Sequence, residues 1–186
     1  MKFAHIADTH LGYKQYGLLE RENDFYYTFN KIVDKIIEER VDFVIHSGDL
    51  FETNRPSPKA LVTFQNALLK LRKADIPMYG ITGNHDVIQR KGFVPPQELF
   101  RKLGFRLIDQ QRPFYLEGDI FITGIPFMSK SMKPLLMKKL EEASKKAEEY
   151  EKSILILHQG IDKYLPFDYE LETGELPTNF NYYAMG

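Results

Sequence analysis

The sequence predicts an α/β domain with a largely parallel sheet and helices on both of its faces. Short apolar runs rich in β-branched residues alternate along the chain with longer segments in which apolar residues recur at helical spacing. No internal repeat, low-complexity tract or linker interrupts this alternation, so residues 1–186 are expected to form one domain.

In the first half of the chain, each expected element has a local signal. Apolar residues spaced three and four positions apart predict an amphipathic helix over residues 23–40. Ser57 followed by Pro58 is typical of a helix start, because Ser caps the first turn and Pro fits the first helical position. The apolar runs that flank these helices predict strands over residues 2–7, 42–46 and 77–82.

In the second half, Pro95 and Pro96 open a short helix that is expected to end at Gly104. Gly118 and Asp119 separate two apolar runs and predict a hairpin turn. The remaining expected elements are hairpin strands over residues 114–117 and 120–123, a charged helix over 133–152 and a strand over 153–157.

Composition limits the classes of function. Hydrophobic residues make up 43% and charged residues 27%, as in a folded globular protein. Lys and Arg number 25 against 26 Asp and Glu, so the overall charge gives no argument for nucleic-acid binding. The absence of cysteine excludes disulfides, thiolate metal sites and cysteine nucleophiles. The polar N-terminus does not resemble a signal peptide and no apolar run reaches membrane length, so a cytoplasmic location is expected.

Polar residues suited to metal binding follow several of the expected strands. Asp8 and His10 follow the first strand, and Asp49 follows the second. Asn84 follows the third strand, and His158 ends a later one. Because ligands bind at the carboxyl ends of the strands in open α/β sheets, these side chains are expected to converge at one edge.

The donor types indicate the kind of metal. Carboxylate, imidazole and amide-oxygen donors without sulfur suit Mn²⁺, with Mg²⁺ as an alternative. One ion would not need so many donors, whereas two ions about 4 Å apart with one bridging carboxylate would use them all. Such a pair clamps the attacking and leaving oxygens of a phosphoryl displacement. Gly48 and Gly83 allow the sharp turns that bring the ligands together.

Each motif alone also has an ordinary explanation. Asp-x-His and Gly-Asp at strand ends are common in turns, where Asn and Asp are frequent residues. His5 and His46 lie inside expected strands and are expected to be packing residues. The metal site is therefore predicted from the order of the motifs, which is D-x-H, G-D, G-N-H-D and a strand-final His, each after a strand.

This ordered set resembles the signature of the calcineurin-like metallophosphoesterase superfamily. Within it, the stretches HIADTHLGY, HSGDLFETNRPSPKAL, LHQG and NYYAMG resemble the Mre-type (SbcD-like) nucleases of DNA double-strand-break repair, of archaeal kind. The resemblance covers essentially the whole chain. It implies a sandwich-like sheet core with flanking helices.

The resemblance also implies roles for the five donors. Asp8 and His10 would hold one Mn²⁺. Asn84 and His158 would hold the other, and Asp49 would bridge the two.

Two further residues near the donors have implied roles. By the same resemblance His85 would not be a ligand, but would face the scissile phosphate and protonate the leaving oxygen as a general acid. Some relatives have His at the position of Glu52, and related phosphatases use an Asp there to orient the catalytic His. Glu52 is therefore expected either to orient His85 or to be a solvated loop residue.

The function implied by the resemblance is a Mn²⁺-dependent DNA nuclease, a double-strand exonuclease and single-strand endonuclease. It would process DNA ends in double-strand-break repair with a Rad-type coiled-coil ATPase. The loop that contains Asn54 and Arg55 would contact DNA. Relatives dimerise through the helices that follow Ser57 and Pro95, so a homodimer is expected. The apolar candidates for its interface are Leu61, Phe64, Leu68, Leu99 and Phe100.

One departure from the family pattern concerns the last residues. In relatives a His-x-His pair follows the final Gly of this stretch and gives one ligand to each ion, whereas the sequence given ends at Gly186. The DNA-capping and ATPase-binding regions of relatives are also absent from residues 1–186. These residues alone are therefore expected to fold, to bind metal weakly and to be nearly inactive.

Two alternatives remain open from the sequence. A small-molecule or protein phosphoesterase on the same scaffold would have nearly identical motifs, because fold and metal site do not fix the substrate. The Mre-like loop over residues 53–58 favours the nuclease. A non-catalytic scaffold that has lost its metals is disfavoured by His85 and by the intact run of ligands.

Overall fold

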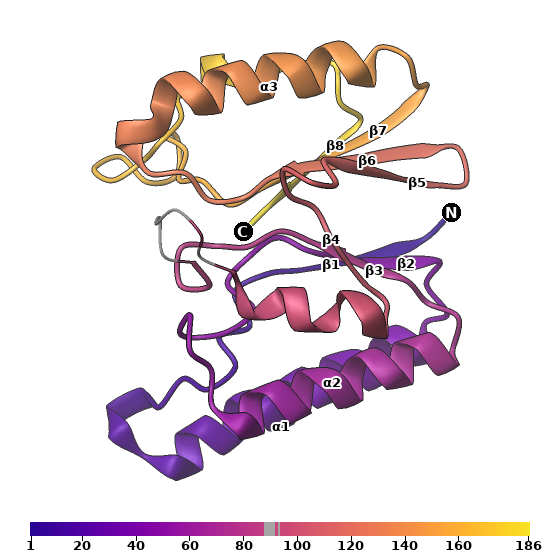
Figure 1. Cartoon of the computed structure of the whole chain (residues 1–186), viewed down its shortest axis with the longest axis vertical. Helices are drawn as coiled ribbons and strands as arrows, with labels where there is room; N and C mark the ends of the chain where they lie inside the picture. Colours follow the sequence, from indigo (N-terminus) through magenta and orange to yellow (C-terminus); the bar gives the residue numbers. More distant parts are fainter. Residues whose placement is uncertain (88–91, 93) are drawn as a thin grey trace.

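The chain folds into four layers (Figure 1). A computed structural model describes residues 1–87, 92 and 94–186. Two four-stranded sheets face each other, with α1 (Leu19–Glu38) and α2 (Pro58–Lys73) outside the first sheet and α3 (Lys133–Ala147) outside the second. The predicted α/β class and sandwich-like core are confirmed, whereas the expectation of a single sheet with helices on both faces is wrong.

The first sheet is parallel throughout. Its strands, in spatial order, are β1 (Phe3–Ile6), β2 (Phe43–His46), β3 (Met78–Gly80) and β4 (Phe105–Leu107). Parallel pairing needs crossover connections, which α1, α2 and the 3-10 helix η2 (Pro96–Leu103) provide in turn. Along β2, Val44 packs against the helices while Phe43 and Ile45 face the second sheet.

The second sheet is mixed. Its strands, in spatial order, are β5 (Phe114–Glu117), β6 (Ile120–Ile125), β7 (Lys152–Leu157) and β8 (Tyr182–Met185). β5 and β6 form an antiparallel hairpin with Glu117 opposite Ile120, as predicted, and β6, β7 and β8 are parallel. Three short 3-10 helices lie in the connections: η1 (Gln15–Gly17), η3 (Lys130–Met132) and η4 (Thr173–Glu175).

Aliphatic and aromatic side chains fill the space between the sheets. Ile45 of the first sheet shares one buried cluster with Ile122 and Ile156 of the second. A second cluster, which includes Phe64, lies between the first sheet and its helices, and a third, which includes Leu136, lies under α3. Apolar burial on both faces of both sheets holds the layers together.

Two capping signals marked helix ends correctly. Ser57 caps α2, and its Oγ accepts a hydrogen bond from Ala60 N at 3.2 Å. Gly104 ends η2 in the left-handed region with a φ of 106°, a conformation that glycine adopts without strain.

Several elements differ from expectation. α1 begins at Leu19 rather than at residue 23, and no side chain caps its start, so the sequence held no signal there. α3 ends at Ala147 rather than at residue 152, and β7 begins at Lys152. The strands β4 and β8 lie outside the expected elements. Neither α1 nor any other helix of the described residues combines the length and apolar character needed to cross a membrane.

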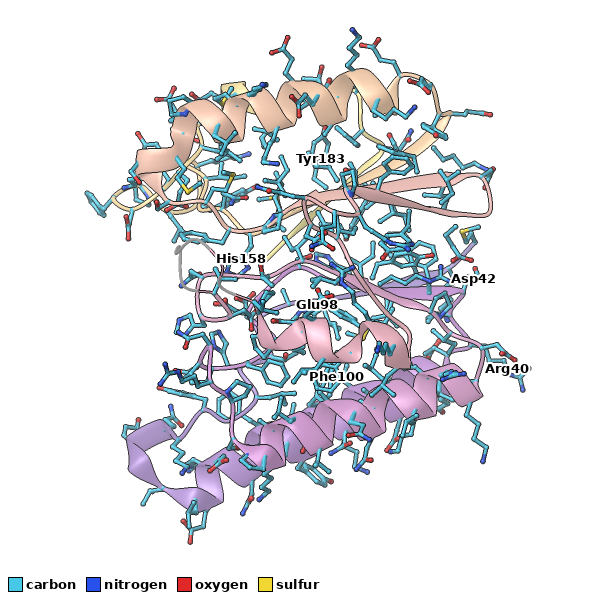
Figure 2. The ribbon with its side chains drawn as sticks, viewed as in Figure 1. Arg40, Asp42, Glu98, Phe100, His158 and Tyr183 are labelled. Carbon is cyan, nitrogen blue, oxygen red and sulfur yellow. The ribbon has the colours of Figure 1, made fainter. Side chains whose placement is uncertain are left out.

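The loops that follow β1 and β2 run side by side at one edge of the first sheet. Asp8 N donates to Gly48 O at 3.1 Å. His10 N donates to Asp49 O at 3.1 Å. Figure 2 shows His158, which follows β7, between the layers of the two sheets. The fold thus brings the ends of strands from both sheets to one place.

Candidate metal centre

Three of the predicted ligands have unusual backbone conformations. Asp8, His10 and Asp49 have φ values of 52°, 41° and 53°, in the left-handed region that residues other than glycine rarely adopt. Such conformations cost free energy and persist where the surrounding structure holds them, often at functional sites. Here the hydrogen bonds between the two loops hold these residues in place.

Asp49 lies at the centre of the predicted ligands. Its side chain is only 4% exposed, and its Oδ2 lies 3.8 Å from His10 Nε2 and 3.4 Å from His158 Nε2. On the more exposed side, Asp8 Oδ1 lies 3.9 Å from His10 Nε2. One donor atom from each of Asp8, Asp49 and His158 lies within 4.8 Å of the other two. The structure therefore brings these four residues together.

Partners on the other ring nitrogen orient both histidines. His158 Nδ1 lies 2.8 Å from Ser47 O, and because a carbonyl only accepts, Nδ1 carries a proton. His10 Nδ1 lies 2.8 Å from the carboxylate oxygen Oε2 of Glu52, which likewise accepts. In the neutral rings this leaves the lone pair on Nε2, directed at Asp49. An acceptor behind the imidazole is the usual arrangement for metal-binding histidines.

Asn84 completes a cluster of acceptors around His158. Its Oδ1 lies 3.0 Å from His158 Nε2, and Asp49 Oδ2 lies 3.4 Å from the same nitrogen. With His158 neutral, lone pairs of three atoms face one another, an arrangement that a bound cation would stabilise. This mixture of oxygen and imidazole nitrogen fits Mn²⁺ or Mg²⁺.

The contact between His158 and Asp49 shifts the pKa values of both groups. Burial lowers the pKa of His158, but its hydrogen bond to Asp49 and the charge of that carboxylate outweigh burial and raise the pKa above its usual value. Burial raises the pKa of Asp49, but its contacts with His158 and His85 outweigh burial and lower the pKa. Both shifts favour a protonated His158 beside an ionised Asp49.

Metal binding is expected to release this proton, because a ligand imidazole must be neutral. Since the pKa of His158 is raised above 6.5, competition from protons begins above that pH. We expect the apparent Mn²⁺ affinity to fall as the pH is lowered through the raised pKa of His158. Calorimetry in two buffers of different ionisation enthalpy should show the release, and His158→Asn should release fewer protons. Equal heats in the two buffers would contradict the prediction.

Two glycines let the loops approach closely, as predicted. A Cβ atom on Gly83 would overlap the carboxylate of Asp49. A Cβ atom on Gly48, which has a φ of 101°, would lie 2.5 Å from His158 Nδ1. Any larger residue at either position would therefore displace a predicted ligand.

His85 faces the site without joining the acceptor cluster. Its backbone N donates to Asp49 Oδ1 at 2.9 Å, and its Nδ1 lies 2.9 Å from Glu52 O. Because the carbonyl only accepts, Nδ1 carries a proton, and Nε2 is the nitrogen that remains for a substrate. The ring packs edge-on against His10, with centroids 4.8 Å apart. His85 is thus fixed beside the donors and is still partly exposed.

Glu52 contacts both histidines, in a way that corrects the expectation. Its carboxylate binds His10, whereas the distance from Glu52 Oε1 to His85 Nδ1 is 3.8 Å. The backbone carbonyl of Glu52, rather than its carboxylate, orients His85. The Glu52 side chain is only 25% exposed, which does not fit a solvated loop residue. Donor atoms of His10, Glu52 and His85 lie within 4.8 Å of one another and form a second group that a metal could occupy.

His5 and His46 are packing residues, as predicted. His46 is fully buried with its Nε2 2.9 Å from Thr9 Oγ1, and burial lowers its pKa to about 3, which keeps it neutral. His5 lies 2.7 Å from Ser47 Oγ through Nε2 and 3.1 Å from the Tyr182 hydroxyl through Nδ1.

Sequence reasoning missed two residues that shape the site. Asp86 follows His85 in the Gly-Asn-His-Asp motif and was given no role, yet it is fully buried and accepts three backbone hydrogen bonds. Burial raises the pKa of Asp86, while those hydrogen bonds oppose the shift. Ser47 orients His158 through its carbonyl. No sequence signal marks that contact, because every residue type has a carbonyl.

The candidate DNA-contact loop directly follows Glu52. Arg55 is exposed and Asn54 is half-buried. The loop is fixed at its far end by Ser57, which caps α2. Arg55 is therefore presented to solvent a few residues from the donors.

Three of the five candidate dimer residues belong to the core, which corrects the expectation that they form a surface. Phe64, Leu68 and Phe100 are at most 3% exposed and pack beneath the first sheet. Leu61 is partly buried against the same cluster, while Leu99 is 66% exposed. The main apolar stripe of an amphipathic helix faces its own protein, which explains the burial.

Comparisons with known proteins agree with this geometry. The family model described as calcineurin-like phosphoesterase matches residues 1–182. The chain belongs to the calcineurin-like phosphoesterase family. Phosphoesterase domains of this family bind divalent metal ions, and the acceptor cluster around Asp49 fits such ions.

Curated relatives within the family come from archaea and carry the name DNA double-strand break repair protein Mre11. Those from Methanocaldococcus jannaschii and Methanococcus maripaludis are 43% and 41% identical over 187 and 189 residues. One from Saccharolobus solfataricus is 40% identical over 189 residues. The alignments cover 100% of this chain but 50%, 51% and 49% of the relatives, so the chain spans about half their length. They confirm the resemblance to Mre-type proteins.

Proposed function

We propose that the protein is a metal-dependent DNA nuclease that processes DNA ends in double-strand-break repair. The observation that carries the proposal is the pair of imidazole Nε2 atoms, from His10 and His158, that face one oxygen of Asp49. Each ring is held from behind by an acceptor. This arrangement suits two divalent ions with a bridging carboxylate. The names of the relatives support DNA as the substrate.

The proposed centre takes two Mn²⁺ ions, with Mg²⁺ as an alternative. Asp8 and His10 would hold one ion. Asn84 and His158 would hold the other, with Asp49 shared. When bound, the ions would polarise the phosphate and supply hydroxide near neutral pH.

His85 is the proposed general acid. Its Nδ1 is held by the carbonyl of Glu52, so the ring presents Nε2 to the substrate. When the ring is doubly protonated, Nε2 also carries a proton. As hydroxide bonds to phosphorus and the P–O bond to the leaving strand breaks, that proton moves to the leaving oxygen, which departs as a hydroxyl. The amide of His85 is also bound to Asp49, which fixes the ring relative to the donors.

The direct test is cleavage by the full-length protein of end-labelled blunt duplex DNA and of circular single-stranded DNA. With Mn²⁺, we expect shortening of the duplex and cutting of the circle, and EDTA should stop both reactions. Hydrolysis of nitrophenyl phosphate esters without cleavage of either DNA would instead support the alternative, a small-molecule phosphoesterase. Arg55→Ala should weaken DNA binding and leave ester hydrolysis unchanged, because this exposed cation can contact a phosphate backbone.

We also propose a Rad-type coiled-coil ATPase as partner, which rests on the resemblance to Mre-type proteins. Purification of the full-length protein with such an ATPase from the same organism tests it. Absence of a complex at micromolar concentrations of both proteins would contradict it.

A polypeptide of residues 1–186 offers each proposed ion three side-chain donors, counting Asp49 twice. We therefore expect weak Mn²⁺ binding and little cleavage from this polypeptide alone, since water would fill the remaining positions without preorganisation. Calorimetry beside a nuclease assay tests this. Two tight sites and robust cleavage would show that three donors for each ion suffice.

We propose a homodimer through the outer surface of α2 and η2. Val62 and Leu99 are 53% and 66% exposed there, and a two-fold interface would place such a patch against its own copy. Val62→Asp with Leu99→Asp should yield monomers in sedimentation at concentrations where the unmutated protein is dimeric. Leu116→Asp, at a residue 50% exposed on β5, is the control and should stay dimeric. A monomeric unmutated protein at tens of micromolar would contradict the proposal.

A further inference from the structure

Asp86 joins the two loops that carry the shared carboxylate and the amide donor. The side chain is fully buried, and both of its oxygens accept hydrogen bonds from backbone amides. Oδ2 accepts from Leu50 N at 3.1 Å and from Gly83 N at 3.0 Å. Oδ1 accepts from Phe51 N at 2.9 Å. One side chain thus ties the loop after β2 to the loop after β3.

The bonded amides lie next to proposed metal ligands in the sequence. Leu50 directly follows Asp49, and Gly83 directly precedes Asn84. A change in the separation of the loops would therefore move the carboxylate of Asp49 relative to the amide oxygen of Asn84. Backbone hydrogen bonds, by contrast, already tie the loop after β1 to the loop after β2 without Asp86.

The chemistry of this contact makes it stiff. Burial of a carboxylate is costly unless hydrogen bonds compensate for the lost water. Hydrogen bonds from amides to a charged oxygen are stronger than those between neutral groups. Asp86 therefore resists small displacements of either loop more than a neutral contact would.

We propose that Asp86 is a positioning residue that sets the geometry of one half of the metal centre. By fixing the loop separation, it holds Asn84 at the correct distance from Asp49. Its loss should weaken the ion bound by Asn84 and His158 more than the ion bound near Asp8. Several backbone hydrogen bonds join the loops after β1 and β2, whereas without Asp86 the loops after β2 and β3 keep the bond from His85 N to Asp49 Oδ1. The inference rests on the proposed two-ion centre but does not require nuclease activity.

Two substitutions of Asp86 should weaken the contact between the loops to different extents. Asp86→Asn keeps the shape, and its single oxygen can retain the Leu50 and Gly83 amides while its NH₂ group faces the Phe51 amide. Asp86→Ala removes all three contacts. We expect the Mn²⁺ affinity of the site formed by Asn84 and His158 to fall about 10-fold in Asp86→Asn and about 100-fold in Asp86→Ala.

Three measurements on the full-length protein test the effect of Asp86 on the metal centre. Calorimetry gives the two Mn²⁺ affinities, and electron paramagnetic resonance distinguishes a coupled Mn²⁺ pair from single ions. Hydrogen exchange resolved to single amides should be faster at Phe51 in Asp86→Asn, by about 10-fold or more, and unchanged in β2 and β3. The control is Asn181→Ala, which removes a similar clamp at the other end of β7, where Asn181 Oδ1 accepts from Ser153 N at 2.7 Å.

The inference is supported if the Asp86 variants lose affinity at the site of Asn84 and His158 and keep it at the other site. At limiting Mn²⁺, their electron paramagnetic resonance spectra should then be those of single ions. Equal weakening of both sites, or unchanged affinities in a folded variant, would overturn it. If Asp86→Ala does not fold, Asp86→Asn decides, since it keeps two of the three contacts. Two Mn²⁺ sites in an unmutated protein that cuts no DNA would defeat the proposed nuclease function and leave the role of Asp86 intact.

Discussion

Asp49→Ala is expected to abolish DNA cleavage while the protein remains folded. The Asp49 carboxylate lies 3.8 Å from His10 Nε2 and 3.4 Å from His158 Nε2, so its removal damages both proposed metal sites at once. Loss of an outer partner of a metal ligand costs about 10–100-fold in affinity or activity, and loss of a shared ligand should exceed that. The fold should survive because Asp49 lies in a loop after β2 and not in the sheet.

A matched control lies at the other end of the same strand. Asp42 precedes β2, and its carboxylate accepts a hydrogen bond from Lys2 N at 2.6 Å. Figure 2 shows Asp42 and His158 on opposite sides of the molecule. Asp42→Ala should retain Mn²⁺ binding and cleavage. Full nuclease activity in Asp49→Ala, measured with circular dichroism to confirm folding of both variants, would refute the bridging role.

His85→Ala is expected to lose cleavage and keep the metal. The ring contacts Glu52 and His10, and it does not belong to the donor group formed by Asp8, Asp49 and His158. Removal of a general acid typically lowers the rate by about 10²–10⁴-fold. Mn²⁺ affinity should stay close to that of the unmutated protein. Single-turnover cleavage at saturating Mn²⁺ separates the two effects.

His10→Ala provides the contrast for this prediction. It removes a proposed ligand, so affinity and cleavage should fall together and excess Mn²⁺ should restore part of the activity. A collapse of metal affinity in His85→Ala would show that His85 is a ligand. The second donor group, made of His10, Glu52 and His85, would then be the place to look for the ion.

The convergence of the donors was predictable because it depends on where strands end. Asp8, Asp49 and Asn84 follow parallel strands of one sheet, and parallel strands bring their carboxyl ends to one edge. His158 comes from the second sheet, and its approach depends on how the two sheets face each other. The family resemblance predicted the contribution of His158, because the alternation of strands and helices alone predicted a single sheet.

The side-chain contacts between loops could not be predicted from local sequence signals. The partner of the Glu52 carboxylate is His10, at a separation of 42 residues, and the sequence does not show which histidine a carboxylate will reach. The same holds for Asp86 and its three amides. Apolar periodicity likewise could not separate buried Phe64 from exposed Leu99, because it does not show how many layers cover a helix.

The most direct test of the central claim is the anomalous scattering of Mn²⁺ in crystals of the full-length protein. We expect two peaks about 4 Å apart, with the Asp49 carboxylate between them. One peak should lie beside Asp8 and His10, and the other beside Asn84 and His158. Peaks confined to the group of His10, Glu52 and His85, or no peak near Asp49 at millimolar Mn²⁺, would show that Asp49 does not bridge two ions.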